Sequence, residues 1–424
     1  MFSEKVATAL VGVALLLLSC SQAPPPCDDV LGCVDVPSGA PLKIGVIQSL
    51  SGTVATLGNE QVRGLELALG RRGDRVLGRP VDLRIEDTGC SPEGGANAAL
   101  RIASDPMVVA IFGTTCSSDA ATAAEIMSAA GLVMISGNNS APYLTSVRGR
   151  KAAKWQAGYL RTAPNEESSG PAAARYAFEK LSVRKAALVN DGDIYTTGLT
   201  TGFREEFLAL GGEIVFEGAV TRNDPDMEPF LTAVRNSGAE LIFFPLFQPD
   251  GNALLQQGRK APGFEKMIFM SDGALIDASF LAAVREDALG MHFVSPAPPA
   301  PGAALDSLAA DYRAKYGTDA PTIYYISAFD AANILFAALE KTARTLPDGS
   351  LRIVGGDVDH RAGLRVAVTE EQKVESVALG QDDHVGLREA GGNARSRFSP
   401  FAARDRCADL VNCFDAHGAS SWID

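Results

Sequence analysis

Histidine is scarce in this sequence, and the catalytic motifs that depend on it are missing. Only 4 of the 424 residues are histidine, and none lies in an HExxH arrangement. The sequence also has no GxSxG elbow and no P-loop, so neither a general base nor a phosphate-binding loop is evident. These absences argue against an enzyme and give no reason to expect a cofactor. A secreted hydrolase is therefore the weakest functional hypothesis.

Candidate metal ligands are few. The spacings of cysteine and histidine fit no zinc site. Two clusters of acidic residues with a histidine are compatible with a cation, although a solvated polar loop explains them better: Asp357, Asp359 and His360, and Asp382, Asp383 and His384. We expect no bound metal.

Basic residues do not gather in a stripe. The net charge of -13 comes from Asp and Glu spread along the chain, which mainly favours solubility. Nucleic-acid binding relies on phosphate contacts from clustered Lys and Arg, so nucleic acid is not an expected partner. With 46% hydrophobic residues and no low-complexity block, a chain of this length can bury a large core and form two domains.

Long hydrophobic runs are confined to the N-terminus. The first segment, MFSEKVATALVGVALLLLSC, has an apolar run of about a dozen residues, shorter than the roughly 20 that span a bilayer. We interpret residues 1–19 as a signal peptide. The end of this segment, LLSC, resembles the lipobox of bacterial lipoproteins, which implies that Cys20 is acylated and becomes the mature N-terminus. An ordinary signal peptide with an incidental cysteine is the alternative, and both place the rest of the chain outside the cytoplasm.

Six further cysteines are then expected in an oxidising compartment. An even number of cysteines in such a compartment favours disulfides over metal ligation. They are Cys27, Cys33, Cys90, Cys116, Cys407 and Cys413.

The sequence between the leader and the end of the chain alternates strand-like and helix-like segments. Residues 20–41 contain Pro, Ser and Gly without periodicity and are predicted to be a lipidated tether, so the fold is expected to begin at Leu42. Strand-like segments then follow at 43–50, 81–87, 107–113 and 132–136, separated by helix-like ones, and the pattern restarts after about residue 165. This alternation predicts two α/β lobes, each a parallel sheet covered on both faces, with a cleft between them.

Polar residues follow several of the predicted strands, where ligands bind in open parallel sheets. Ser117 begins a helix whose free N–H groups and dipole attract anions. Asn138 and Ser140 follow the next strand. In the second half Tyr195, Phe247 and Asp272 hold the matching positions. An anion receptor on one lobe and a carboxylate on the other would suit a zwitterion.

Each of these residues also has a purely structural interpretation. Ser117 is a favoured residue for capping its helix, and Ser140 for satisfying a turn. Asp272, directly before a glycine, is compatible with a simple turn. Tyr195 and Phe247 are compatible with packing. Spacing alone does not decide between these interpretations and ligand binding.

Six segments, in order, resemble one protein family. They are KIGVIQSLSGTVATLGNEQVRGLELAL, FGTTCSS, MISGNNSAPYLT, YLRTAPNEESSGPAAA, VNDGDIYTTG and FMSDG. As a set they resemble the extracytoplasmic substrate-binding proteins of branched-chain amino acid ABC transporters, which have the type I periplasmic binding protein fold. The resemblance covers roughly residues 42–345 and implies two doubly wound parallel-sheet lobes joined by a three-segment hinge. Lobe 1 would comprise residues 42–162 and 296–348, and lobe 2 residues 163–295 with part of 349–424.

The resemblance also implies roles for individual residues. By motif position, Ser117 and Ser140 would receive the α-carboxylate of an amino acid, while the Asn138 carbonyl and the Asp272 carboxylate would receive its α-ammonium. Two further residues, Tyr195 and Phe247, would close over the ligand, and Leu57 would line its side-chain pocket. Relatives often carry Tyr at the positions of Leu57 and Phe247, and branched-chain binders often carry Glu at that of Asp272. The side chain of the ligand is therefore left open.

The resemblance further implies a disulfide between Cys90 and Cys116, because relatives commonly link these positions. Cys27–Cys33 and Cys407–Cys413 are predicted as local loops, with cross-pairing of these four as the alternative. The segment CADLVNC at 407–413 resembles a cysteine hairpin near the end of some members, whereas residues 350–406 cannot be placed.

Together these features predict a lipid-anchored solute-binding protein at the outer side of a membrane. It would capture an amino acid or related small carboxylate by lobe closure, without covalent chemistry, and hand it to the permease subunits of an ABC transporter. The alternative within the same fold is a ligand-sensing or regulatory module that acts on a partner protein.

Overall fold

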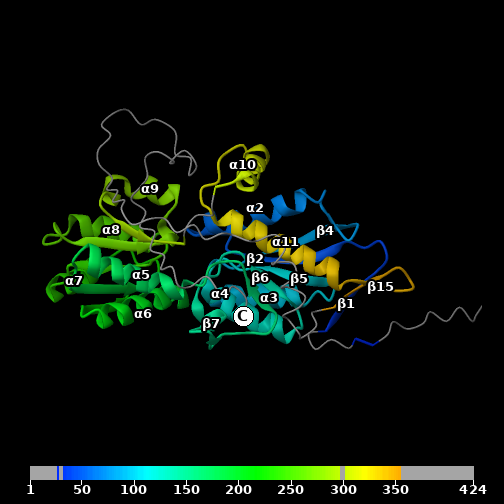
Figure 1. Cartoon of the computed structure of the whole chain (residues 1–424), viewed down its shortest axis with the longest axis horizontal. Coiled ribbons are helices and arrows are strands. Elements are labelled where there is room, and N and C mark those ends of the chain that lie inside the picture. The colour runs from blue at the N-terminus through cyan, green and yellow to red at the C-terminus, as the bar shows by residue number, and fades with distance from the viewer. Residues whose placement is uncertain (1–25, 28–31, 297–300, 355–424) are drawn as a thin grey trace, which may run out of the picture.

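The computed structural model describes residues 26–27, 32–296 and 301–354. The predicted signal peptide, the predicted acylation site Cys20, the predicted Cys407–Cys413 pair and the two Asp/His clusters lie outside the described residues. Within them the chain forms two lobes, each built on its own sheet (Figure 1).

Lobe 1 is built on a six-stranded sheet that is parallel except at one edge. Its strand order is β3 (Arg75–Val76), β4 (Arg79–Asp87), β2 (Leu42–Gln48), β5 (Val108–Gly113), β6 (Met134–Ser136) and β9 (Tyr159–Arg161), with only the β3–β4 pair antiparallel. Helices α2 (Ala55–Gly70) and α11 (Tyr324–Thr342) pack on one face through residues such as Leu65 and Phe336. Helices α3 (Pro92–Ala103) and α4 (Ser117–Ala129) pack on the other through their alanines. Both faces are thus covered, which is why the central strands β2 and β5 are mostly apolar and buried.

Lobe 2 repeats the plan with a fully parallel five-stranded sheet. Its strand order is β11 (Glu213–Ala219), β10 (Lys185–Asn190), β12 (Leu241–Phe243), β13 (Ile268–Asp272) and β14 (His292–Val294). Helices α5 (Ser169–Arg175) and α6 (Ile194–Ala209) cover one face, with Phe203 stacked on Phe243 at a centroid distance of 4.8 Å. Helices α7 (Glu228–Ser237), α8 (Asp250–Lys260) and α9 (Ala278–Val284) cover the other. The predicted pair of α/β lobes is confirmed.

The described elements pass from lobe 1 to lobe 2 and back to lobe 1. It leaves lobe 1 after β9 and enters α5 through a single turn at Glu166–Ser168. It returns after β14 to α10 (Ala303–Tyr316), which packs on α2 through Leu308 and Tyr312. The third crossing implied by the family resemblance lies outside the described residues.

A small antiparallel sheet corrects one prediction. Strand β1 (Cys33–Val36) pairs with β16 (Leu351–Val354), which also pairs with β15 (Arg344–Thr345). Val36 and Ile353 are buried in the lobe 1 core, and Asp35 accepts two 2.7 Å bonds from Arg352. The prediction that the fold begins at Leu42 is therefore wrong, and the chain joins lobe 1 from Cys33. Residues 351–354 likewise join lobe 1, whereas the segment containing them was assigned in part to lobe 2.

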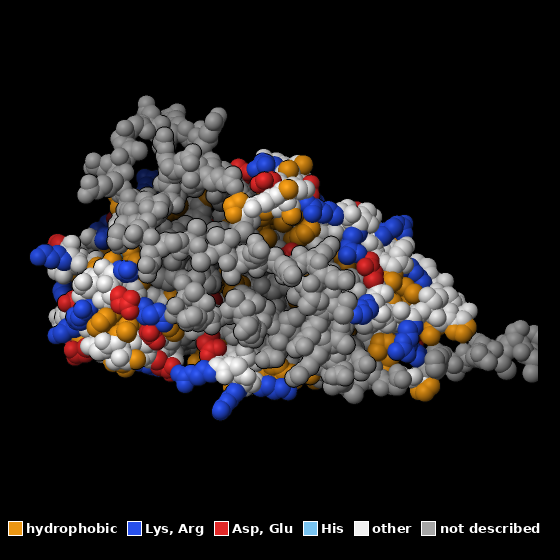
Figure 2. Space-filling view, in the orientation of Figure 1, with side chains coloured by type: hydrophobic (Ala, Val, Ile, Leu, Met, Phe, Trp, Pro, Cys, Tyr) orange, Lys and Arg blue, Asp and Glu red, His pale blue; other side chains and the backbone are white. Residues whose placement is uncertain are grey.

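Two of the three expected disulfides are present in the described residues. Cys90–Cys116 links the turns after β4 and β5 in lobe 1. Cys27–Cys33 closes a local loop that ends at the first residue of β1. Across the described ranges no helix is both long and apolar enough to cross a membrane, and no group of metal-ligating side chains forms a site. On the face shown in Figure 2, acidic and basic side chains are interspersed, as the scattered charge of the sequence predicts.

Candidate ligand-binding site between the lobes

Two turns at the carboxyl ends of β5 and β6 form the lobe 1 side of the site. Ser117 begins α4, and its Oγ accepts a 3.3 Å bond from the N–H of Ala141 in the neighbouring turn. Ser136, the last residue of β6, accepts bonds of 3.0 Å from the N–H groups of Asn138 and Asn139 and donates one of 2.9 Å to the Thr114 carbonyl. These bonds hold the two turns side by side.

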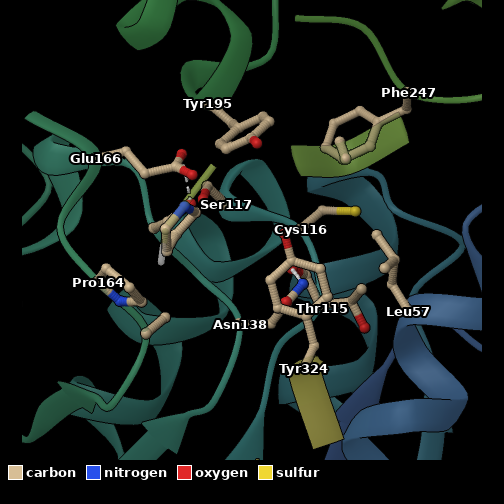
Figure 3. A pocket seen from close by; sticks show the side chains of 14 residues that line it. Leu57, Thr115, Cys116, Ser117, Asn138, Pro164, Glu166, Tyr195, Phe247 and Tyr324 are labelled. Atoms are coloured by element: carbon tan, nitrogen blue, oxygen red, sulfur yellow. Dashed lines mark hydrogen bonds between the residues drawn. The ribbon is translucent and has the colours of Figure 1, made fainter. Parts of the chain in front are cut away.

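A cavity of about 30 Å³ lies between these turns and lobe 2 (Figure 3). This volume holds little more than one or two waters, so a ligand requires the lobes to separate or the lining side chains to move. Six of the seven sequence-predicted ligand residues line it: Leu57, Ser117, Asn138, Ser140, Tyr195 and Phe247. The lining also includes Thr115, Cys116, Ala163, Pro164, Glu166, Ala274, Pro296 and Tyr324.

Lobe 2 contributes a pair of aromatic side chains. Tyr195 lies at the start of α6, which Asp193 caps by accepting a 2.8 Å bond from the Tyr195 N–H. The Tyr195 ring stacks on Phe247 at a centroid distance of 5.4 Å. Phe247 also packs against Val54 and the Cys90–Cys116 disulfide of lobe 1. These two rings form the lobe 2 wall of the cavity (Figure 3).

Asp272, the seventh predicted residue, does not line the cavity. It ends β13, is 1% exposed, and accepts a hydrogen bond from the Tyr195 hydroxyl, so Tyr195 separates it from the cavity. Its Oδ2 also accepts a 3.3 Å bond from the Ala274 N–H, whereas its Oδ1 has no partner among the described residues. Direct contact between Asp272 and a ligand stays a prediction, and it requires Tyr195 to move.

Glu166 is the main site residue that the sequence reasoning missed. It starts the crossing turn, and its Oε2 accepts a 2.8 Å bond from Ser140, the serine predicted to bind a carboxylate. In Figure 3 its side chain extends toward Ser117. The acidic residues of the segment TAPNEESSG are visible in the sequence. However, the rule that ligands bind at the carboxyl ends of strands does not apply to a turn where the chain passes between lobes.

The lining carries one acidic side chain, that of Glu166, and no basic one. Burial raises the pKa of Glu166 to about 8, with nearby Asp272 adding to the effect. Burial also raises the pKa of Asp272 to about 7. Arg161 acts on Glu166 electrostatically, but its guanidinium donates to the Asn139 and Ala141 carbonyls and to Thr145. The site is therefore prepared for a group that donates hydrogen bonds or carries positive charge.

Arg222, in the segment after β11, joins the lobes beside the cavity. It donates to Asp191 at 2.7 Å and to Asp193 at 2.8 Å within lobe 2, and to the Cys90 carbonyl of lobe 1 at 2.9 Å. Asp193 also accepts a bond from the hydroxyl of Ser118 in lobe 1. These contacts, with the small cavity, describe a closed arrangement of the lobes.

Three buried carboxyl groups at or near the site predict how stability depends on pH. Burial raises the pKa values of Asp119 and Asp272 to about 7 and that of Glu166 to about 8. Groups whose pKa is raised by folding stabilise the folded state at low pH and lose that contribution as the pH rises through the folded value. We expect the ligand-free protein to become less stable between about pH 5 and pH 8. Urea unfolding at several pH values measures this, and a free energy that rises over that range would contradict it.

Comparisons with known proteins agree with this geometry. The family model for periplasmic binding protein matches residues 41–384. The chain belongs to this family. The predicted resemblance to substrate-binding proteins of branched-chain amino acid ABC transporters is thereby confirmed, and so is the type I periplasmic binding protein fold.

Individual relatives of the periplasmic binding protein family are distant. The chain is 28% identical over 56% of its length to an amino acid binding protein of Pseudomonas aeruginosa, of which it covers 62%. It is 23% identical, with a TM-score of 0.64, to the structure of a leucine binding protein from Thermotoga maritima, over 71% of this chain and 83% of that one. A solute binding protein of an ABC transporter from R. palustris in complex with benzoate is 22% identical, with a TM-score of 0.63, over 77% and 85% of the two chains.

Proposed function

We propose that this protein captures an amino acid or a related small carboxylate between its lobes and delivers it to an ABC permease outside the cytoplasm. The observation that carries the proposal is a cavity that gathers predicted ligand residues from both lobes at the carboxyl ends of their strands. The Pseudomonas relative is an amino acid binding protein, which supports an amino acid as the ligand.

The geometry suggests how each part of an amino acid would be held. Its carboxylate would lie at Ser117, where the N-terminus of α4 offers unpaired N–H groups and the positive end of the helix dipole. Its ammonium would face the Asn138 carbonyl and the acidic side of the cavity. Tyr195 and Phe247 would close over the ligand, and Leu57 would contact its side chain. Binding favours the closed form only to the extent that the ligand contacts both lobes.

Thermal unfolding in the presence of individual amino acids tests the proposal. A ligand at 100 times its dissociation constant stabilises the folded state by about 2.7 kcal/mol, a readily measured shift. Ser117→Ala should reduce the shift, whereas the matched control Ser128→Ala, near the other end of α4, should not. The absence of a shift with every amino acid and small carboxylate tested would contradict the proposed function.

We further propose that Cys20 carries a lipid anchor. Each buried methylene of an acyl chain contributes about 0.8 kcal/mol to membrane binding, so two or more chains hold a protein firmly. The wild-type protein should therefore partition into the detergent phase, and Cys20→Ser should release it or block its processing. Equal partitioning of the wild type and a processed Cys20→Ser variant would exclude lipidation at this residue.

A further inference from the structure

Glu166 gives the cavity a carboxylate at the position where a ligand carboxylate was expected to bind. The residue is 7% exposed, lines the cavity, and occupies the hydroxyl of Ser140 through a 2.8 Å hydrogen bond. Ser140 is therefore not free to donate to a ligand carboxylate while this bond exists. Burial raises the pKa of Glu166 to about 8, so near neutral pH its carboxyl group is mostly protonated in the ligand-free closed form. A ligand cation beside Glu166 would favour the ionised carboxylate, whereas a ligand carboxylate would oppose it, because like charges in a buried site repel strongly.

No base within the described residues neutralises Glu166 by direct pairing. The lining contains no Lys, Arg or His, and none of the ion pairs between described residues includes Glu166. Arg161, which acts on Glu166 electrostatically, donates hydrogen bonds to two backbone carbonyls and Thr145 rather than to Glu166. Ionising a buried carboxyl group without a cationic partner costs free energy. A ligand that supplies the cation offsets this cost and therefore binds more tightly.

Asp272 strengthens the acidity of the same region without reaching the cavity. It acts on Glu166 electrostatically, but the Tyr195 hydroxyl lies between it and the cavity. Glu166 is therefore the carboxylate with direct access to a ligand in the closed arrangement.

We propose that Glu166 selects the ligand class, by binding a cationic nitrogen in preference to groups that carry no positive charge. This inference rests on the proposed function and narrows it to amino acids or similar ammonium-bearing solutes. The carboxylate of such a ligand is left to Ser117 and the N-terminus of α4, and its ammonium lies beside Glu166. A simple aromatic acid such as benzoate has no cationic nitrogen to pair with Glu166.

Titration calorimetry with the standard L-amino acids and with benzoate tests the assignment on wild type and Glu166→Gln. Glutamine keeps the length of the side chain and an oxygen that accepts the Ser140 bond, so the fold is expected to persist, and thermal unfolding checks this. We expect wild type to bind at least one amino acid and to bind benzoate more weakly. In Glu166→Gln the affinity for that amino acid should fall about tenfold or more, since a charge-assisted hydrogen bond is lost. Discrimination against benzoate should weaken at the same time.

Glu167→Gln is the matched control. Glu167 neighbours Glu166 in the sequence but bonds to the Arg148 N–H at 2.6 Å and does not line the cavity, so this variant should bind like wild type. If wild type and Glu166→Gln bind the amino acid equally well, or wild type prefers benzoate to every amino acid, the inference is overturned while solute binding stands. If wild type binds no member of the panel, the proposed function fails together with the inference.

Discussion

Replacing Arg222 by alanine is expected to lower the free energy of unfolding by about 2–3 kcal/mol and to weaken ligand binding about tenfold. The change leaves Asp191 and Asp193, whose side chains are 1% and 0% exposed, without their cation. Breaking a buried ion pair costs about 3–5 kcal/mol, and the 31% exposure of Arg222 reduces this because water screens the charge.

The loss of affinity has a separate cause. Arg222 donates to the Cys90 carbonyl across the lobes, and it positions Asp193, which accepts from Ser118 across the lobes. Each bond contributes about 1 kcal/mol to the closed form, so losing both shifts the equilibrium toward the open form by about a factor of ten or more.

Urea unfolding and calorimetry of the same variant measure both effects. The matched control is Arg204→Ala, because Arg204 pairs with Glu217 at 2.6 Å within lobe 2 and both side chains are about one-third exposed. This surface pair should contribute less than about 1 kcal/mol and should not change affinity. If Arg222→Ala is no less stable than Arg204→Ala and binds like wild type, the contacts of Arg222 do not hold the lobes closed.

Replacing Asp272 by alanine is expected to weaken binding of an amino acid at least tenfold. Its buried Oδ1 lacks a hydrogen-bond partner, and a ligand ammonium would supply one once Tyr195 moves aside. Removing one side of a desolvated charge pair costs roughly 2–5 kcal/mol, and about 1.4 kcal/mol corresponds to a factor of ten.

The control for Asp272→Ala is a change in the ligand. An analogue of the same amino acid without its amino group should bind wild type weakly and lose little affinity in the variant, because it never used this carboxylate. Titration calorimetry of the four combinations separates a charge interaction from a packing effect. Equal losses for the amino acid and its analogue would mean that Asp272 only supports the position of Tyr195.

The sequence predicted the lobes and the lobe 1 side of the cavity because both follow from local patterns. Apolar strands alternate with helices, and the turn residues Ser117, Asn138 and Ser140 come directly after strand ends. In a parallel sheet such turns must lie along one edge, so their proximity needs no knowledge of side-chain packing. The strand-end rule also placed Tyr195 and Phe247 at the facing edge of lobe 2.

Features that depend on contacts distant in the sequence could not be predicted in this way. Glu166 reaches the cavity only because the chain crosses between lobes there, and β1 is recognisable only through its partner β16, more than three hundred residues later. Asp272 was placed at the correct strand end, but β13 continues through it, and its carboxylate accepts a bond from the Tyr195 hydroxyl instead of lining the cavity. How deeply a strand-end residue is buried behind the cavity depends on packing between helices and strands. Neither the hydrophobic periodicity nor the residue spacing of the sequence predicts this depth.

The central claim is that the cavity between the lobes holds the ligand. Its most direct test is mass spectrometry of the small molecules released by denaturing wild type and Ala274→Trp, after each has been equilibrated with an amino acid mixture and desalted. Ala274 lines the cavity, and an indole there would occupy the space that a ligand needs while leaving the carboxyl groups in place. We predict that wild type releases one ammonium-bearing carboxylate in near-equimolar amount and that folded Ala274→Trp releases almost none. Equal release from the two proteins would contradict the account, because the ligand would then bind elsewhere.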